Sequence, residues 1–238
     1  MVGKSVTLNY LGKIGVTRKI FSYLGYLLLV PSLLFNVYQL GRNQEQKSTY
    51  LVKDVIDGDT FVTEESGRLR MANIDAPDPG YCGAEEAKEY LNQKISGKTV
   101  RLEFFGRDSF NRPLVYVYID KELVNETMLR EGLADYYIGE GDKLVREQLK
   151  IVTQEARTKE KGVHGSTCTQ KTPENPKCVI KGNLGGDNDS EKIYHFPGCR
   201  DYDKILLEKF RGEQWFCSEK EAIAAGFVKA KTCYDKKF

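Results

Sequence analysis

Three short segments between residues 57 and 112 concentrate acidic residues and arginines. They are Asp57-Gly58-Asp59-Thr60, then Arg70 with Asp75-Ala76-Pro77-Asp78, and then Asp108 to Arg112. Each segment alone is typical of a turn or a surface loop. Carboxylates, however, are hard oxygen ligands for cations such as calcium, and a guanidinium group bonds two phosphoryl oxygens at once. The combination therefore points to chemistry at a single site, which the fold must assemble.

The elements around these segments alternate between short strands and helices. Strand-like runs cover residues 50–56, 60–64, 68–74, 99–104 and 114–119. Apolar residues at helical spacing predict helices over residues 84–95, 124–129 and 145–156, the last with Asp142 as its N-cap. Five strands with interleaved helices predict an α+β fold built on a small antiparallel barrel.

In their order and spacing these motifs resemble those of the staphylococcal nuclease-like, or thermonuclease, family. The matching residues are Ile56 to Thr60, Arg70 to Asp78, Asp108 to Arg112, Val124-Asn125 and Gly132-Leu133-Ala134. The resemblance covers residues 50–165 and implies a five-stranded OB-fold β-barrel with three helices. It also implies calcium-dependent hydrolysis of phosphodiester bonds that leaves 3′-phosphate ends.

The resemblance assigns a role to each matching residue. Asp59, Asp75 and the Ala76 carbonyl match the family's calcium ligands, and Asp57 falls near the metal as an outer-shell group. These oxygen donors suit calcium and not zinc. Arg70 and Arg112 match the two arginines that grip the phosphate, because a guanidinium fork stays charged and bonds two oxygens.

Position 78 departs from the family's pattern. The family has a glutamate there, which positions and activates the attacking water, and this sequence has Asp78. Aspartate is one methylene shorter, and a displacement of about 1 Å costs on the order of 100-fold in rate. Either the loop 78–83 shifts, or Glu85 or Glu86 substitutes, or the enzyme is slow. We expect Glu85 and Glu86 to form a solvated first helical turn.

Two further positions depart from the family's pattern in ways that the fold can accommodate. Asn111 replaces the family's glycine before the arginine, and asparagine accepts a left-handed conformation. His164 stands where the family often has a tryptophan, and we expect it to be packed or exposed there rather than catalytic.

The expected substrate is single-stranded DNA or RNA. Tyr136 and Tyr137 are candidates for stacking on a base, with core packing as the alternative. Residues 50–165 hold 17 basic and 22 acidic residues, which argues against coating of a duplex through many phosphate contacts. The two histidines of the chain exclude machinery built on several histidines. We expect a monomer.

The N-terminus carries a membrane signal. Residues 20–40 are 21 consecutive uncharged residues, enough for a helix to cross a bilayer core of about 30 Å. No small-residue cleavage pattern follows, which favours an uncleaved signal-anchor. Four basic residues precede the span, so the positive-inside rule predicts a cytoplasmic N-terminus and export of the remainder.

Six cysteines agree with export, since an even number in an exported chain favours disulfides. Cys168 and Cys178 flank a short loop and are candidates to close it. In the C-terminal module two alternatives stand: a zinc site of His195, Cys199, Cys217 and Cys233, or a disulfide pairing Cys199 with Cys233 or Cys217. Export and the absence of C-x-x-C favour the disulfide.

These features divide the chain into five parts. They are a cytoplasmic basic N-terminus (1–19), a transmembrane signal-anchor (20–40), the nuclease-like domain (50–165), a linker (166–190) and a small Cys-containing α/β module (191–238). The leading hypothesis is a membrane-anchored, extracytoplasmic, calcium-dependent endonuclease. The alternative is an OB-fold module that binds nucleic acid or protein with a weak catalytic site, and Asp78 is the feature that favours it.

The topology makes a direct prediction. Protease added to intact cells or spheroplasts should degrade the part of the chain after residue 42, because the basic flank keeps only the N-terminus inside. Immunoblotting of the digested cells measures this, and full protection of the chain would refute the topology.

Overall fold

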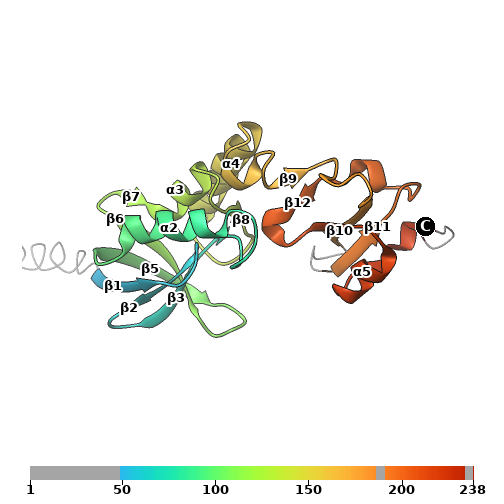
Figure 1. Cartoon of the computed structure of the whole chain (residues 1–238). Coiled ribbons are helices and arrows are strands. Elements are labelled where there is room, and N and C mark those ends of the chain that lie inside the picture. Colours follow the sequence, from blue (N-terminus) through green and yellow to red (C-terminus); the bar gives the residue numbers. More distant parts are fainter. Residues whose placement is uncertain (1–48, 186–190, 234–237) are drawn as a thin grey trace, which may run out of the picture. The chain divides into compact units, whose positions relative to one another are not determined.

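In the computed structural model of the chain, which describes residues 49–185, 191–233 and 238, five strands form a closed barrel (Figure 1). These strands are β1 (Thr49–Val55), β2 (Thr60–Thr63), β3 (Gly67–Met71), β5 (Thr99–Arg107) and β6 (Pro113–Ile119). Neighbours in the order β3-β2-β1-β5-β6 pair antiparallel, and a parallel pairing of β3 with β6 closes the ring. The five-stranded barrel expected from the sequence is confirmed.

Three helices accompany the barrel, as predicted. They are α2 (Ala84–Ile95), α3 (Val124–Arg130) and α4 (Lys143–Thr158). The Asp142 side chain caps α4 by accepting from the backbone N–H groups of Leu144 and Val145. After α3, Gly132 has a φ of +68°, and a Cβ there would lie 2.2 Å from the Lys161 carbonyl oxygen. Only glycine fits this turn, which packs α3 closely against the segment that follows α4.

One predicted strand breaks in two. The run 68–74 continues only to Met71, and Ile74–Asp75 forms a separate short strand, β4, that pairs with β8 (Asp135–Tyr136). Asn73 lies between them with a φ of +60°, a conformation that asparagine tolerates better than most residues. The break turns the chain out of the barrel wall, so that Asp75 no longer continues β3.

Asn125, at the start of α3, stabilises this break. Its side-chain amide donates to the Ala72 carbonyl at 2.8 Å, and its carbonyl oxygen accepts from the Val117 N–H at 3.0 Å. Asn125 is fully buried, and its amide also donates to the Val115 carbonyl at 3.3 Å. It therefore supplies partners to backbone groups that the strand ladders leave unpaired.

A second core belongs to the C-terminal module. Four strands pair in the order β13 (Gln214–Phe216), β10 (Ile180–Gly185), β11 (Glu191–His195) and β14 (Val228–Lys229), and α5 (Glu219–Ala224) packs on them. Ser218 caps α5 by accepting from the Glu221 N–H. Phe196, Phe216 and Phe227 fill the core of the module.

The region predicted to be a linker carries structure. Within 166–190 lie β9 (Thr169–Gln170), which pairs with β12 (Leu207–Glu208), and the strand β10. Packing explains the glycine at position 182 of β10, because a Cβ there would lie 2.5 Å from the Phe216 ring. A glycine in a strand often marks such a close approach.

The structure joins the six cysteines in three disulfides: Cys82–Cys168, Cys178–Cys217 and Cys199–Cys233. The expectation that Cys168 closes a loop with Cys178 is wrong. Cys168 instead lies in a small apolar cluster with Val163 and Phe210, against which Cys82 packs. The pairing of Cys199 with Cys233 is one of the two that the sequence left open.

The predicted span 20–40 lies outside the described residues. Among those that are described, no helix has the length and apolar character needed to cross a membrane.

Asn125→Ala should lower the free energy of unfolding by about 2–4 kcal/mol, because it leaves the Val117 N–H and the Ala72 carbonyl buried without partners. Urea denaturation followed by circular dichroism measures this. The control is Gln93→Ala, whose side chain bonds Glu89 on the exposed face of α2 and whose loss should matter little. Equal stability of the two variants would contradict a structural role for Asn125.

Candidate functional site

The centre of the site is a buried carboxylate, that of Asp59. Its turn from Ile56 to Thr60 joins β1 to β2, and the Asp57 side chain closes it by accepting from the Asp59 N–H at 3.1 Å. Gly58 allows the turn to lie close to α2, since a Cβ there would be 2.7 Å from that of Ala87 and 2.6 Å from that of Ala76. In this position of the turn the Asp59 side chain is buried, with 2% of it exposed.

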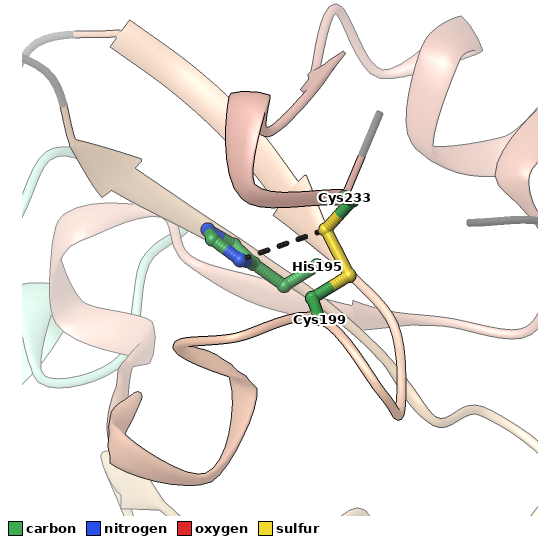
Figure 2. Close-up of side chains that lie close together, drawn as sticks. All are labelled: His195, Cys199 and Cys233. Carbon is green, nitrogen blue, oxygen red and sulfur yellow. Dashed lines mark hydrogen bonds between the residues drawn. A yellow bond between two sulfur atoms is a disulfide. The ribbon is translucent and has the colours of Figure 1, made fainter. Parts of the chain in front are cut away.

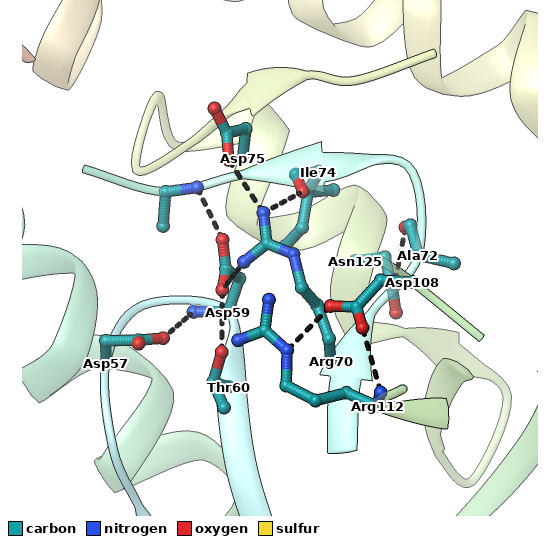
Figure 3. Close-up of polar contacts among 11 residues, drawn as sticks. Asp57, Asp59, Thr60, Arg70, Ala72, Ile74, Asp75, Asp108, Arg112 and Asn125 are labelled. Atoms are coloured by element: carbon teal, nitrogen blue, oxygen red, sulfur yellow. Dashed lines mark hydrogen bonds and ion pairs between the residues drawn. The ribbon is translucent and has the colours of Figure 1, made fainter. Parts of the chain in front are cut away.

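Several donors hold the Asp59 carboxylate (Figure 3). The Ala76 N–H donates to it at 2.8 Å, the Thr60 hydroxyl at 3.0 Å, and the Arg70 guanidinium forms an ion pair with it. Burial raises the pKa of Asp59 to about 7, although Arg70 and the Ala76 N–H act in the opposite direction. The ionised form of Asp59 therefore depends on nearby positive charge.

Arg70 connects the two carboxylates predicted to bind metal. It stands on β3 opposite Thr60 of β2, and its second terminal nitrogen lies 2.7 Å from the Asp75 carboxylate on β4. Burial works against the charged form of Arg70, but Asp59 and Asp75 outweigh it and raise the pKa of the guanidinium. The fold thus brings together Asp59 from the β1–β2 turn, Arg70 from β3 and Asp75 from β4.

The second arginine is positioned by its own loop between β5 and β6. The Arg112 Nε donates to the Asp108 carboxylate at 2.6 Å, and Asp108 also accepts from the backbone N–H groups of Phe110 and Arg112. Asn111 has the left-handed conformation that the sequence predicted, with a φ of +63°. Asp108 is therefore a positioning residue for Arg112, a role that the sequence motif alone did not assign.

Both arginines face one cleft of about 540 Å³. Asp57, Asp75 and Asp78 line it with them, and Asp59 lies directly behind Arg70. The structure therefore assembles all the predicted catalytic residues and the acidic side chains predicted as metal ligands. At Ala76 it shows the N–H beside Asp59, and the carbonyl as a ligand stays a prediction.

Of the three carboxylates proposed as the base, only Asp78 lines this cleft among the described residues. Glu85 lines a separate depression with Asp54 and Lys88, and Glu86 is exposed in the first turn of α2, as expected. A carboxylate that the sequence did not single out, Glu140, also lines the cleft. No motif surrounds it, so sequence reasoning had no signal for it.

The two tyrosines predicted as candidates for base stacking lie in different environments. Tyr137 is 57% exposed and lines the cleft beside Ile138, whereas Tyr136 packs against the barrel core with its ring 5.7 Å from the Lys150 Nζ. Consecutive residues of an extended segment point to opposite sides, which explains the difference. Phe110, 79% exposed on the opposite loop, is a second aromatic residue of the cleft that the sequence analysis missed.

The donors at the site fit a hard cation. Asp57, Asp59 and Asp75 offer only oxygen atoms, and the one buried carboxylate among them needs a neighbouring positive charge to stay ionised. Calcium takes such oxygen ligands in flexible geometry, while zinc prefers nitrogen and sulfur.

The candidate metal cluster of the C-terminal module has a different arrangement (Figure 2). Nδ1 of His195 lies 3.9 Å from the Cys233 sulfur, and Cys233 is bonded to Cys199. Cys217 is bonded to Cys178, so the four residues of the zinc alternative are not brought together. The disulfide alternative is confirmed. Burial lowers the pKa of His195.

His164 is packed, in agreement with its expected role. It is buried, its ring meets that of Phe210 edge-on at 5.6 Å, and burial lowers its pKa. It therefore belongs to the contact between the barrel domain and the module.

A closed OB-type barrel with a cleft that gathers two arginines and several carboxylates defines a class of proteins equipped to bind an anion beside a cation. Comparison with known proteins specifies the family. Residues 68–164 match the family described as staphylococcal nuclease homologue.

Three relatives support the same family assignment. The thermonuclease of Staphylococcus hyicus is 29% identical over 134 residues, covering 52% of this chain and 79% of the relative. The thermonuclease of Staphylococcus intermedius is 30% identical over 130 residues, or 46% and 77% of the two chains. An uncharacterized endonuclease of Escherichia coli O157:H7 is 34% identical over 113 residues, or 46% and 72%. The chain belongs to the staphylococcal nuclease family.

Proposed function

We propose that this protein is a calcium-dependent endonuclease that hydrolyses phosphodiester bonds of single-stranded DNA or RNA. The observation that carries the proposal is the cleft in which Arg70, Arg112 and the Asp59–Asp75 pair meet, in a barrel of a family whose relatives are named thermonucleases and endonucleases.

Each residue of the cleft has a role that follows from the chemistry of its side chain. Arg70 and Arg112 bind the scissile phosphate, and because Asp108 already holds Arg112 through its Nε, this side chain loses little entropy when the substrate enters. Asp59, Asp75 and the Ala76 carbonyl would hold the calcium ion, with Asp57 outside them, and the ion would supply positive charge to the phosphoryl oxygens. Asp78 accepts a proton from the water that attacks phosphorus. The bond from phosphorus to the 5′ oxygen breaks, and this oxygen keeps the electron pair and takes a proton from solvent, which leaves a 5′-hydroxyl and a 3′-phosphate.

The rim of the cleft supports a single-stranded substrate. Phe110 and Tyr137 are exposed aromatic side chains that line the cleft together with the arginines, and bases must be free of a duplex to stack on them.

We further propose that the protein is a monomer held at the cell membrane by residues 20–40, with the nuclease domain outside the cytoplasm. Three disulfides that use all six cysteines support an oxidising compartment.

The second candidate function is a binding module with weak catalysis. Its support is the shorter Asp78 side chain, which is exposed at the edge of the cleft. Binding of single-stranded nucleic acid without calcium-dependent release of nucleotides would favour this candidate.

Arg70→Lys should lower kcat by about 100- to 1,000-fold, although the charge is kept. Lysine is a point donor and cannot bond phosphate and carboxylate together as the guanidinium does. Release of acid-soluble nucleotide at saturating calcium measures it. Arg130→Lys, on the surface of α3 and paired with Glu126, is the matched control. Near-normal turnover of the Arg70 variant would mean that Arg70 does not contact the phosphate.

Asp78→Ala should lower kcat by about 100- to 10,000-fold, because the water loses its proton acceptor. Asp78→Glu should keep or raise the rate, since the longer side chain restores the family's reach. Glu85→Ala, which changes a carboxylate outside the cleft, should have no effect. Single-turnover assays with and without calcium measure all three. If Asp78→Ala stays active, the base lies elsewhere, and Glu140 is the next carboxylate of the cleft to test.

A further inference from the structure

A second cleft lies directly beside the catalytic one. Its volume is about 460 Å³, and it is bounded on one side by Gly80, Tyr81 and Cys82 of the barrel domain and on the other by the C-terminal module. Asp78 lines the catalytic cleft, so the loop 78–82 separates the two clefts. A chain that crosses this loop would occupy both.

The module is fixed against this loop by covalent and packing contacts. The Cys82–Cys168 disulfide joins the loop to the start of the module, and the Lys209 N–H donates to the Cys168 carbonyl at 2.8 Å. The Tyr81 ring lies on Gly212, where a Cβ would be 2.6 Å from it. The walls of the second cleft are therefore held in place before any ligand binds, which lowers the entropic cost of binding.

A short helix of the module supplies the lysine of the second cleft. This helix is η3 (Lys209–Arg211), and Lys209 lines the cleft.

The lining of the second cleft matches a single strand of nucleic acid. It combines two aromatic rings, a lysine and side-chain amides: Tyr81, Trp215, Lys209, Gln170, Asn175 and Gln214. The Trp215 indole N–H donates to the Gln170 amide oxygen at 3.1 Å, which fixes the ring. Aromatic rings stack on bases of any sequence, and amides and lysine bond sugar and phosphate oxygens.

One acidic residue opposes an anionic ligand. Glu174 lies 3.5 Å from the Lys209 Nζ, and its side chain is 79% exposed. An exposed ion pair of this kind is weak, so a phosphate can replace the carboxylate on Lys209. The other acid of the lining, Glu213, is buried and accepts from the backbone N–H groups of Leu184 and Glu208.

We propose that the second cleft is a nucleic-acid subsite, in which Trp215 and Tyr81 stack on bases and Lys209 binds a phosphate of the strand that is cut in the neighbouring cleft. The proposal rests on the proposed function, because the ligand is the same single strand. It gives the C-terminal module a role in substrate binding and predicts a preference for substrates long enough to cross the loop 78–82.

Trp215 is the single tryptophan of the chain, so emission excited selectively from tryptophan, and not from the 14 tyrosines, reports on this cleft alone. We would titrate the full chain, without calcium to prevent turnover, with oligothymidylate of about 16 nucleotides, the upper end of the site size of one OB fold. We expect saturable quenching by the long strand and much weaker binding of a thymidine dinucleotide. Binding of the long strand, seen by anisotropy of a labelled oligonucleotide, without any change in tryptophan emission would overturn the proposal.

Kinetics provide the second test. Trp215→Ala should raise KM for the long strand by about 5- to 150-fold, the factor expected for one stacked base, and so shrink the ratio of KM values between dinucleotide and long strand. Glu174→Gln should lower KM for the long strand, a gain that misfolding cannot imitate. The controls are Lys220→Ala, exposed on α5, and Glu65→Gln, exposed in the β2–β3 turn, which removes the same charge far from the cleft.

The outcomes separate the two proposals. If the wild-type protein hydrolyses neither substrate, the proposed nuclease function fails, while the fluorescence titration still decides whether the subsite binds. If the wild-type protein hydrolyses both, but neither the Trp215 variant nor the Glu174 variant changes the KM ratio, the subsite is refuted and the nuclease function stands.

Discussion

The burial of one carboxylate, that of Asp59, is the constraint on which the rest of the site depends. A carboxylate removed from water must be compensated by hydrogen bonds and opposite charge, or it becomes protonated. The protein supplies the Ala76 N–H, the Thr60 hydroxyl and the Arg70 guanidinium. Each of these donors comes from a different part of the barrel domain, so the closed barrel must bring all of them to Asp59 for the buried carboxylate to remain ionised.

Closure of the barrel therefore also determines where the two arginines of the cleft lie. The parallel pairing of β3 with β6 sets Arg70 beside Leu114, two residues after Arg112, and brings the two arginines to the same end of the barrel. The antiparallel pairing of β2 with β3 sets Arg70 opposite Thr60, next to Asp59. A slip of either register by one residue would turn Arg70 to the other face of the sheet and leave Asp59 buried without its ion pair.

Local signals in the sequence were sufficient for the barrel and the three helices, because alternation, helical spacing and turn residues agree there with the final structure. Local signals were not sufficient where contacts between residues distant in the sequence determine the structure. The strand break at Asn73 depends on Asn125, which is 52 residues away, and on the Tyr116 hydroxyl, which donates to the Asn73 side chain at 2.7 Å. The disulfide partners and the strand β10 likewise follow from the packing of the module, where Gly182 and the phenylalanine rings determine the fit.

The family motif singled out Arg70, Arg112 and the acidic side chains at residues 57, 59 and 75 as candidates, but it could not reveal how the loop after Asp75 is held. Pro77 fixes the backbone at one end of this loop, and the Cys82–Cys168 disulfide ties the other end to the module. Because the Tyr81 ring also rests on Gly212, the loop has little freedom to move Asp78. In the function proposed above, the reach of the Asp78 side chain and the attachment of the module are therefore coupled. Fixing the loop through the module gives the proposed substrate cleft a rigid wall, and it removes the loop movement that would compensate for a side chain one methylene shorter than glutamate.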